Sequence, residues 1–279
     1  KTQELVWDKC SIINMETGEV LSQDITPKFR DYTFDDFYND FLNNTGIRFL
    51  ETMSAFEPDT IEEDENCIAE KKLDGHRHLL YICGDCNRVF SKRISKKTGW
   101  FKENTDQLPH IRDLKLPNLK GTVLDGEILW GENSTECQSV TGALPETAIQ
   151  NQDISKKCAK SCCFDILYYK GMNVQKLPLL KRKQYLYKVI KEIQKLYCID
   201  YIDYMPIYAL RSMFNEVANS NVGRVIKACS FEGLFNELVG QGAEGIIVKN
   251  LDGKYEQGKR SRAFSKMKKH STWDCVFMG

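Results

Sequence analysis

The sequence lacks long apolar runs, net charge and repetition. No stretch reaches the 18 or so apolar residues that a membrane-spanning helix needs. The first residues do not show the charged and then apolar pattern of a secretory signal. Lys plus Arg and Asp plus Glu number 39 each, so net charge gives no sign of nucleic-acid binding, although a basic face balanced by acids elsewhere stays compatible. We expect a protein that neither spans a membrane nor is secreted.

Length and cysteine content bound the class of protein further. With 279 residues, 42% of them hydrophobic, the chain can bury the core of one large domain or two small ones. Its 11 cysteines, without secretory features, indicate reduced thiols. We therefore expect a cytoplasmic location, or a nuclear or viral-host compartment if the source is eukaryotic or viral.

One pair of cysteines, Cys83 and Cys86, has the Cys-x-x-Cys spacing of zinc ligands. A structural zinc site needs four ligands, so others must lie nearby in space. The available ones are Cys158, Cys162 and Cys163. The alternative is a β-hairpin, because strand-like residues 79–82 and 89–90 flank a Gly84-Asp85 turn. The pattern favours the hairpin.

Residues 1–50 form an N-terminal segment that we expect to precede the main domain or pack on it. Val6-Trp7 and Ile12-Ile13 are typical of short strands. Aromatic residues recur at helical spacing after Thr33, a fair N-cap: Phe34, Phe37, Tyr38 and Phe41. No chemistry is assigned to this segment.

The rest of the chain mixes strands with a few helices. Strands are predicted at 122–124, 128–130, 162–169 and 245–248. One amphipathic helix begins near Leu179, and its apolar face is Leu186, Val189, Ile190, Ile193 and Tyr197. A second contains Phe231, Leu234, Phe235 and Leu238 and ends at Gly240 and Gly242. Because strands and helices do not alternate regularly, the fold class predicted is α+β.

Five polar clusters lie at the edges of predicted strands. They are residues 70–77, 124–127, 164–165, 244–249 and 264–269. Taken alone, each is weak, since a Lys at a strand edge is usually a solvated charge and a Glu beside Gly is usually a turn residue. Together they combine amines, carboxylates and an aromatic ring, which is the set that nucleotide chemistry requires.

Each of these residue types meets a specific chemical need. A covalent phosphoramidate requires an amine that is neutral when it attacks, so nearby positive charge or desolvation must lower its pKa. Carboxylates such as Glu127 and Glu244 suit a hard cation like Mg²⁺. Charge that develops at a phosphate needs preorganised cations. A purine needs an aromatic face, for which Phe164 is a candidate, although a core Phe on a strand has the same spacing.

The first cluster resembles a known signature. Residues 72–77, Lys-Leu-Asp-Gly-His-Arg, match the Lys-x-Asp-Gly-x-Arg motif of the covalent nucleotidyltransferases, which comprise ATP-dependent DNA ligases, RNA ligases and mRNA capping enzymes. The later clusters resemble the other family motifs in the same order, over residues 51–279. Within the family, residues 244–249 and Glu70 look like the DNA ligase forms. The tail 273–279 resembles the stretch where ligases pass into a second domain.

The resemblance implies a fold and a reaction. The fold is an ATP-grasp-like α+β domain, in which helices flank antiparallel sheets and the nucleotide cleft lies between the sheets. In the reaction, Lys72 attacks the α-phosphate of ATP and becomes joined to AMP. The AMP then passes to a 5′-phosphate at a nick in double-stranded DNA, and the adjacent 3′-hydroxyl displaces it.

Roles for the nucleotide-binding residues follow by the same resemblance. Arg77 and Glu127 hold the ribose and the neighbouring phosphate, Phe164 stacks on adenine, and Glu70 contacts the adenine. Lys249, Lys266 and Lys268 neutralise the α-phosphate. Glu244, with Glu127, supports a catalytic Mg²⁺. Asp74 orders the loop around Lys72 and acts mainly in the later steps.

DNA contacts are expected mainly with phosphates. Ligases usually carry Ser-Arg-Asn after the first hairpin, whereas this chain has Ser91-Lys92-Arg93. Either Lys92 or Arg93 takes the role of that arginine at the nick, and we prefer Arg93 because a guanidinium binds phosphate with two hydrogen bonds. A late basic stretch adds Lys259, Arg260 and Arg262, for which the alternative is a solvated loop.

Two further expectations concern the whole protein. We expect the adenylation domain to span residues 51–279 and an OB-fold domain, which is absent from this chain, to follow it; the chain is expected to be a monomer. Two rivals stay open. One is an RNA ligase or a GTP-dependent capping guanylyltransferase, which shares Lys72 and most of the pocket. The other is an inactive ligase-like module that binds DNA or a partner protein.

Overall fold

The computed structural model describes residues 12–13, 20–22, 50–58, 64–94 and 101–269. A short antiparallel ribbon joins β1 (Ile12–Ile13) to β2 (Val20–Ser22), so the predicted strand at 12–13 is confirmed. The strand predicted at Val6-Trp7, the helix predicted after Thr33 and the tail 273–279 lie outside the described residues.

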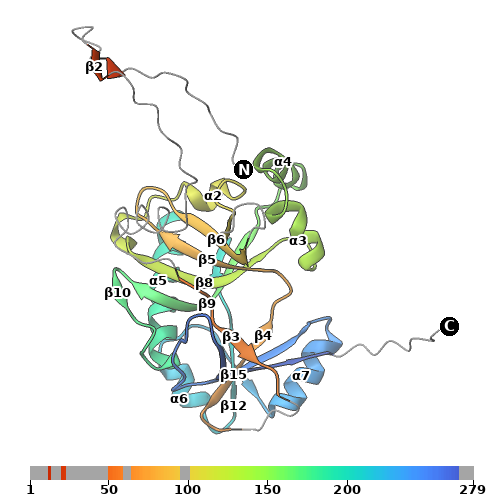
Figure 1. Cartoon of the computed structure of the whole chain (residues 1–279). Helices are drawn as coiled ribbons and strands as arrows, with labels where there is room; N and C mark the ends of the chain where they lie inside the picture. The colour runs from red at the N-terminus through yellow and green to blue at the C-terminus, as the bar shows by residue number, and fades with distance from the viewer. Residues whose placement is uncertain (1–11, 14–19, 23–49, 59–63, 95–100, 270–279) are drawn as a thin grey trace, which may run out of the picture.

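Two sheets make up the body of the molecule (Figure 1). The six-stranded sheet has the order β13-β12-β4-β14-β15-β3, and the seven-stranded sheet has the order β10-β9-β8-β5-β6-β7 with β11 added beside β9. The strands of the six-stranded sheet are β3 (Ser54–Phe56), β4 (Cys67–Lys72), β12 (Ile207–Leu210), β13 (Val225–Ala228), β14 (Gly245–Asn250) and β15 (Arg260–Lys268). Those of the seven-stranded sheet are β5 (His76–Ile82), β6 (Arg88–Ile94), β7 (Phe101–Glu103), β8 (Thr122–Leu129), β9 (Lys160–Tyr169), β10 (Met172–Asn173) and β11 (Ile202–Tyr204).

Most neighbouring strands are antiparallel, as predicted. The exceptions are the parallel pairs β9–β11, β12–β13 and β3–β15. The predicted hairpin is confirmed as β5 and β6, and Gly84 in the turn between them has a φ of +100°, which suits a residue without a Cβ. Within the described residues, no three His, Cys, Asp or Glu side chains are grouped so that they could hold a metal ion.

Helices cover the outer faces of both sheets. They are α2 (Pro109–Arg112), the 3₁₀ turn η1 (Pro117–Leu119), α3 (Ser134–Thr141), α4 (Pro145–Ser155), α5 (Leu179–Tyr197), α6 (Phe214–Asn219) and α7 (Phe231–Gly240). The two predicted helices are α5 and α7. Ser230 caps α7 by accepting a hydrogen bond from the Gly233 amide at 3.0 Å. No helix in the described part of the chain is long and apolar enough to cross a membrane.

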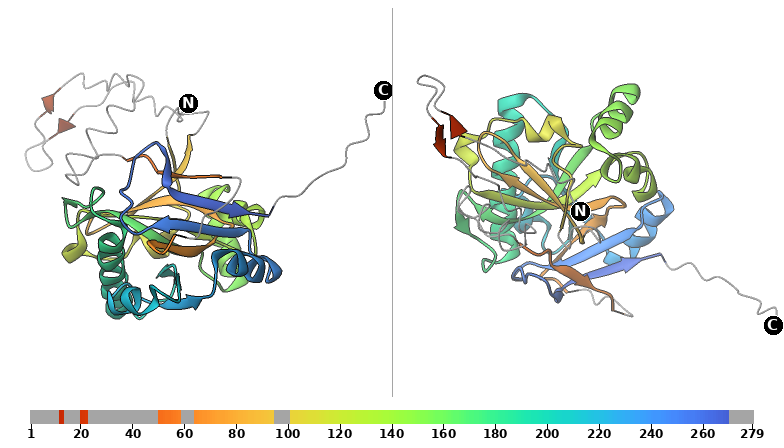
Figure 2. Two further views of the ribbon diagram at one scale, coloured as in Figure 1. Left: turned by 90° about the horizontal axis from the view of Figure 1, so that it is seen from below. Right: turned by 45° about the horizontal axis from the view of Figure 1, so that its top comes forward.

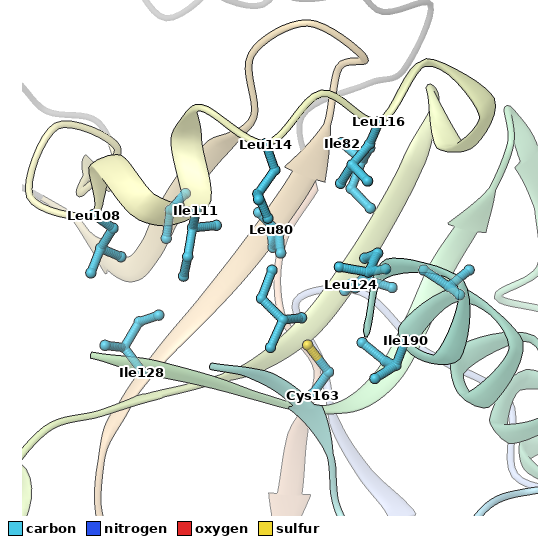
Figure 3. Packing of buried hydrophobic residues seen from close by; sticks show 14 of the residues in the cluster. Leu80, Ile82, Leu108, Ile111, Leu114, Leu116, Leu124, Ile128, Cys163 and Ile190 are labelled. Carbon is cyan, nitrogen blue, oxygen red and sulfur yellow. The ribbon is translucent and has the colours of Figure 1, made fainter. Parts of the chain in front are cut away.

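Three apolar clusters give the molecule its layers. The first lies between the seven-stranded sheet and helices α2 to α5, where Leu80, Leu124 and Ile128 meet Ile111 and Ile190 (Figure 3). The second lies between the two sheets, and the third packs α7 on the six-stranded sheet. In both views of Figure 2, the blue helix α7 lies beside the blue strands β14 and β15. Together the mixed elements confirm the α+β class.

Strand alternation decides which side chains face the space between the sheets. On β4, Ile68 belongs to the cluster between the sheets, whereas Cys67 and Ala69 belong to the cluster under α7. Because successive side chains point to opposite faces, Glu70 and Lys72 share the inner face with Ile68. Clusters 124–127 and 164–165 therefore lie inside strands, whereas clusters 70–77 and 244–249 include strand ends, as expected: residues 73–75 lie between β4 and β5, and Glu244 directly precedes β14. β8 likewise runs unbroken through Asp125-Gly126-Glu127.

The chain passes from one sheet to the other at two short links in the described residues. Residues 73–75 join β4 to β5, and Met205-Pro206 join β11 to β12. The first link lies inside the Lys-x-Asp-Gly-x-Arg motif. The motif therefore begins on the six-stranded sheet and ends on the seven-stranded sheet.

Candidate active site

A pocket of about 260 Å³ opens between the inner faces of the two sheets. Its walls come from β4, β14 and β15 on one side and from β5, β8 and β9 on the other. The predicted site residues that line it are Glu70, Lys72, Arg77, Lys92, Glu127, Phe164, Lys249, Arg260 and Lys266. One cavity thus collects residues that are spread over almost 200 positions of sequence.

Lys72 ends β4 at the pocket, with a side chain about one-fifth exposed. Its ammonium group forms an ion pair with Glu244, because β4 and β14 are antiparallel neighbours and Lys72 pairs with Gly245. The next turn is held by Glu127, whose Oε2 accepts a hydrogen bond from the Gly75 amide at 3.0 Å. A Cβ at Gly75 would lie 2.4 Å from the Ile128 carbonyl oxygen, so the close approach of β8 requires glycine there. Asp74 is exposed in this link.

Arg77 is fixed by a buried carboxylate. Its Nε and Nη2 donate to the two oxygens of Asp125, each at 2.6 Å, and Nη2 also donates to the Met53 carbonyl at 3.1 Å. The Tyr255 hydroxyl donates to the same carboxylate at 2.6 Å. Asp125 is fully buried, so it depends on these partners. The arrangement sets the guanidinium 4.5 Å above the centre of the Phe164 ring, facing the pocket.

Glu70 lies between two lysines at the deepest part of the site. One carboxylate oxygen bonds to Lys183, and the other accepts from Lys249 at 2.5 Å. All three side chains are at most 4% exposed. Burial lowers the pKa of Lys249 to about 8, although the charge of Glu70 acts in the opposite direction. Lys249 is thus an ammonium group with little water around it, 4.7 Å from the Phe164 ring centre.

Lys266 and Lys268 share a carboxylate that the sequence did not predict. Glu57 accepts from Lys266 at 2.8 Å and from Lys268 at 3.1 Å. The hydrogen bonds from these two lysines lower the pKa of Glu57 to about 2, so it is charged at any ordinary pH. Lys266 lines the pocket and Lys268 does not, although both lie on the inner face of β15.

The pKa of Glu127 is shifted in the opposite direction to that of Glu57. Burial raises its pKa to about 7, while the charge of Arg77 and the amide of Gly75 act to lower it. Its surroundings include Lys72 and Glu244. A carboxyl group that titrates near neutrality beside a second carboxylate suits a divalent cation, which stabilises the charged form. Two carboxylates alone fit Mg²⁺, because this ion usually keeps several water and phosphate ligands.

Some of the residues predicted to contact DNA line the pocket, and others do not. Lys92 donates to the Ser54 hydroxyl at 2.8 Å and lines the pocket with Arg260. Arg93 lies on the exposed end of β6. It faces the opposite side of the strand from Lys92, because neighbouring strand residues alternate between the two faces. Lys259 and Arg262 are exposed. The late basic stretch is therefore a strand, β15, and the alternative of a solvated loop applies only to residues before Arg260.

Four residues that matter to the pocket escaped the sequence reasoning: Glu57, Asp125, Lys183 and Tyr255. Asp125 stood in a predicted cluster but received no role. Lys183 had a readable signal, because it lies three residues before Leu186 and four after Leu179, on the apolar face of α5. A lysine on such a face needs a buried acid, which is Glu70.

Comparisons with known proteins agree with this geometry. Residues 51–268 match the family described as ATP dependent DNA ligase domain. The SPbeta prophage-derived DNA ligase-like protein LigB of Bacillus subtilis is 29% identical, over 77% of this chain and 66% of that protein. A probable DNA ligase of Dictyoglomus turgidum is 25% identical, over 76% of this chain and 34% of that protein. The chain thus spans less than two thirds of these relatives.

Among solved structures, the ATP-dependent DNA ligase from bacteriophage T7 in complex with ATP resembles this chain with a TM-score of 0.53. The two are 16% identical, and the match covers 78% of this chain and 68% of that one. At this identity the likeness speaks for the fold, and it confirms the predicted arrangement of two sheets with flanking helices.

Proposed function

The chain belongs to the ATP-dependent DNA ligase domain family, and from this premise we propose that it adenylates its own Lys72 with ATP and passes the AMP to nicked DNA. The convergence of Lys72, Lys249 and Lys266 with Glu127 and Glu244 around one pocket carries the proposal. Four of these side chains line the cavity, and Glu244 joins them through its ion pair with Lys72, so that a nucleophile, phosphate-neutralising cations and carboxylates lie together.

In the first step the Nζ of Lys72 attacks the α-phosphorus of ATP. A P–N bond forms, the bond from the α-phosphorus to the bridging oxygen breaks, and pyrophosphate leaves with the electron pair. The nitrogen must first give up a proton to water and leave its ion pair with Glu244, and it loses a second proton to water once the P–N bond has formed. Lys249 and Lys266 lie on the adjacent strands β14 and β15, and both line the pocket. They can therefore stabilise the negative charge that develops on the α-phosphate.

The seven-stranded sheet would hold the nucleoside. We assign the adenine face to Phe164, whose ring is exposed to the pocket between Arg77 and Lys249. Glu127, directly opposite Arg77 in the β5–β8 register, is assigned to the ribose. Glu70 is assigned to the edge of the base. Because Arg77 is committed to Asp125, its remaining nitrogen and its charge are what it offers to the nucleotide.

Glu127 and Glu244 are the residues that would hold Mg²⁺. When bound, the ion would neutralise phosphate oxygens and favour the leaving pyrophosphate. The raised pKa of Glu127 fits such a role, because a nearby cation favours the carboxylate that burial disfavours.

In the later steps the AMP would pass to a 5′-phosphate at a nick, and a 3′-hydroxyl would displace it. Arg93, Lys92, Lys259, Arg260 and Arg262 are the side chains proposed to contact DNA phosphates, and Asp74 is proposed to act at this stage. The relatives are longer than their matched part, and the proposal includes an OB-fold domain in the whole protein. We also propose that the protein is a monomer. Because every described cysteine is free, we propose a reducing compartment, cytoplasmic or nuclear.

The test is the intact mass of the protein after incubation with ATP and Mg²⁺. We expect one addition of about 329 Da, the mass of an AMP group on Lys72. Lys72→Ala should show none, and the parent should form adduct from GTP far more slowly than from ATP. An adduct from GTP alone would support a capping enzyme instead. The absence of an adduct from either nucleotide would support a binding module.

A further inference from the structure

Lys183 is a buried ammonium group just behind the pocket. Its side chain is 2% exposed, and it is not among the residues that line the cavity. It forms an ion pair with Glu70 and donates a second hydrogen bond to the Phe164 carbonyl at 2.6 Å. A buried charge is costly unless it is paired and hydrogen-bonded, so both contacts are needed to keep it there.

These two contacts tie together the two walls of the base site. Glu70 belongs to β4 on the six-stranded sheet, and Phe164 belongs to β9 on the seven-stranded sheet. Lys183, on α5, reaches both of them. The neighbouring Arg182 anchors the same turn of α5, because it donates to both oxygens of Asp165 at 2.8 and 3.0 Å. The position of the ammonium group is thus fixed from the helix side.

The two lysines on Glu70 differ in their surroundings. Lys249 faces the pocket, so a bound phosphate would compete with Glu70 for it. Lys183 has no such access. When Lys249 turns to a phosphate, one oxygen of Glu70 loses its donor while the other keeps Lys183. The result is a charged acceptor that lines the base pocket at a fixed place.

A carboxylate that is held opposite position 6 of the ring distinguishes the two common purines. Adenine carries an amino group at position 6, which donates to a carboxylate, whereas guanine carries a carbonyl oxygen there, which is repelled by it. Buried polar groups built for one pattern reject the other strongly, because a mismatch leaves them unpaired.

On the basis of the function proposed above, we propose that Lys183 is a positioning residue that determines nucleotide choice. It holds the Glu70 carboxylate and the Phe164 backbone so that the pocket accepts a 6-amino purine and rejects a 6-oxo purine. Lys183 itself touches neither the base nor the reacting atoms.

The test compares initial rates of adduct formation from ATP and from GTP on the whole chain. In Lys183→Met, which keeps the length of the side chain and loses its charge, we expect the ATP-to-GTP rate ratio to fall about tenfold or more. Lys183→Arg keeps the charge and should restore most of the ratio. Lys181→Met, on the exposed side of the same turn, is the matched control and should leave the ratio unchanged.

A double-mutant cycle with Glu70→Gln separates positioning from a general loss of structure. If Lys183 acts through Glu70, the selectivity change caused by Lys183→Met should vanish in the Glu70→Gln background. Equal losses with both nucleotides, and so an unchanged ratio, would overturn the proposal. Should Lys183→Met not fold, Glu70→Gln decides alone, because an unchanged ratio there refutes the role of the carboxylate. A parent protein that forms no adduct at all would instead refute the proposed function.

Discussion

Lys72 and Glu244 form an ion pair across two neighbouring strands, although 172 residues separate them in sequence. The pairing of β4 with β14 places the end of one motif beside the start of another. The site is therefore set by strand register, because a shift of one residue would turn Lys72 to the opposite face of its sheet.

Gly75, three residues after Lys72, gives a prediction for the stability of the protein and the rate of adduct formation. A Cβ at Gly75 would meet the Ile128 carbonyl at 2.4 Å and Leu129 at 2.7 Å. We expect Gly75→Ala to lower the free energy of unfolding by about 1–3 kcal/mol and to slow adduct formation, because backbone must shift. Urea unfolding and rapid-quench assays measure the two. Gly240→Ala, at the end of α7 with nothing near its Cβ, is the control and should not destabilise the protein.

The raised pKa of Glu127 predicts a pH dependence of stability. Burial raises this pKa from 4.5 to about 7, so between these values the folded protein binds more protons than the unfolded chain. Stability should therefore fall as pH rises through this window. Between pH 5 and pH 8, we expect the free energy of unfolding of Glu127→Gln to rise by about 2 kcal/mol relative to that of the parent.

Urea unfolding at the two pH values measures this gain. Glu146→Gln, at an exposed position of α4, is the control and should run parallel to the parent. If the difference between Glu127→Gln and the parent stays constant from pH 5 to pH 8, Glu127 is already charged in the folded protein.

Glu57 predicts an effect on phosphate binding. Its carboxylate holds Lys266 and Lys268, the cations assigned to the nucleotide phosphates, and the pKa of about 2 keeps it charged. A phosphate must displace it, so Glu57→Gln should lower the Kd for ATP about fivefold or less, as expected for partly exposed ion pairs. Calorimetry with ATP and with adenosine tests this, because adenosine lacks phosphates and should bind both proteins equally. Weaker ATP binding would mean that Glu57 instead aligns the lysines.

Arg93 and Lys92 predict different defects despite being neighbours. Lys92 lines the nucleotide pocket and contacts Ser54, whereas Arg93 is exposed at the end of β6. Arg93→Ala should weaken binding of nicked DNA and reduce the slope of log affinity against log salt by about one, the value for one lost phosphate contact. Adduct formation should be unchanged in Arg93→Ala and slowed in Lys92→Ala. An unchanged salt slope in Arg93→Ala would remove that residue from the DNA interface.

The sequence predicted those parts of the site whose residue type is fixed by chemistry. A nucleophilic amine, carboxylates and a motif glycine are recognisable because few substitutes perform their tasks. Runs of apolar residues predicted β9 and β14, and helical periodicity predicted α5 and α7. The partners of these residues were not predictable in the same way. Asp125 and Tyr255 are bonded to each other across 130 positions, and Lys183 reaches Glu70 across 113. Such pairs depend on which strands become neighbours, which no local pattern reveals.

The predicted strands were also shorter than those in the structure, as at β8, where one strand replaces two predicted ones. Most residues of the clusters lie within β4, β8, β9, β14 and β15, because a strand can carry polar residues along one face if that face borders a cavity. Segments 134–155 were left without a prediction, since α3 and α4 have weak amphipathic patterns with only a few buried residues.

The two links between the sheets, at 73–75 and 205–206, have a mechanical consequence. If the two sheets shift against each other over the apolar cluster between them, the line through these two links is the natural axis of rotation. Residue 72 adjoins one of these links, so it would travel little while the far rims of the sheets swing apart or together. The attacking amine would then keep its place while parts of the two sheets farther from the links move.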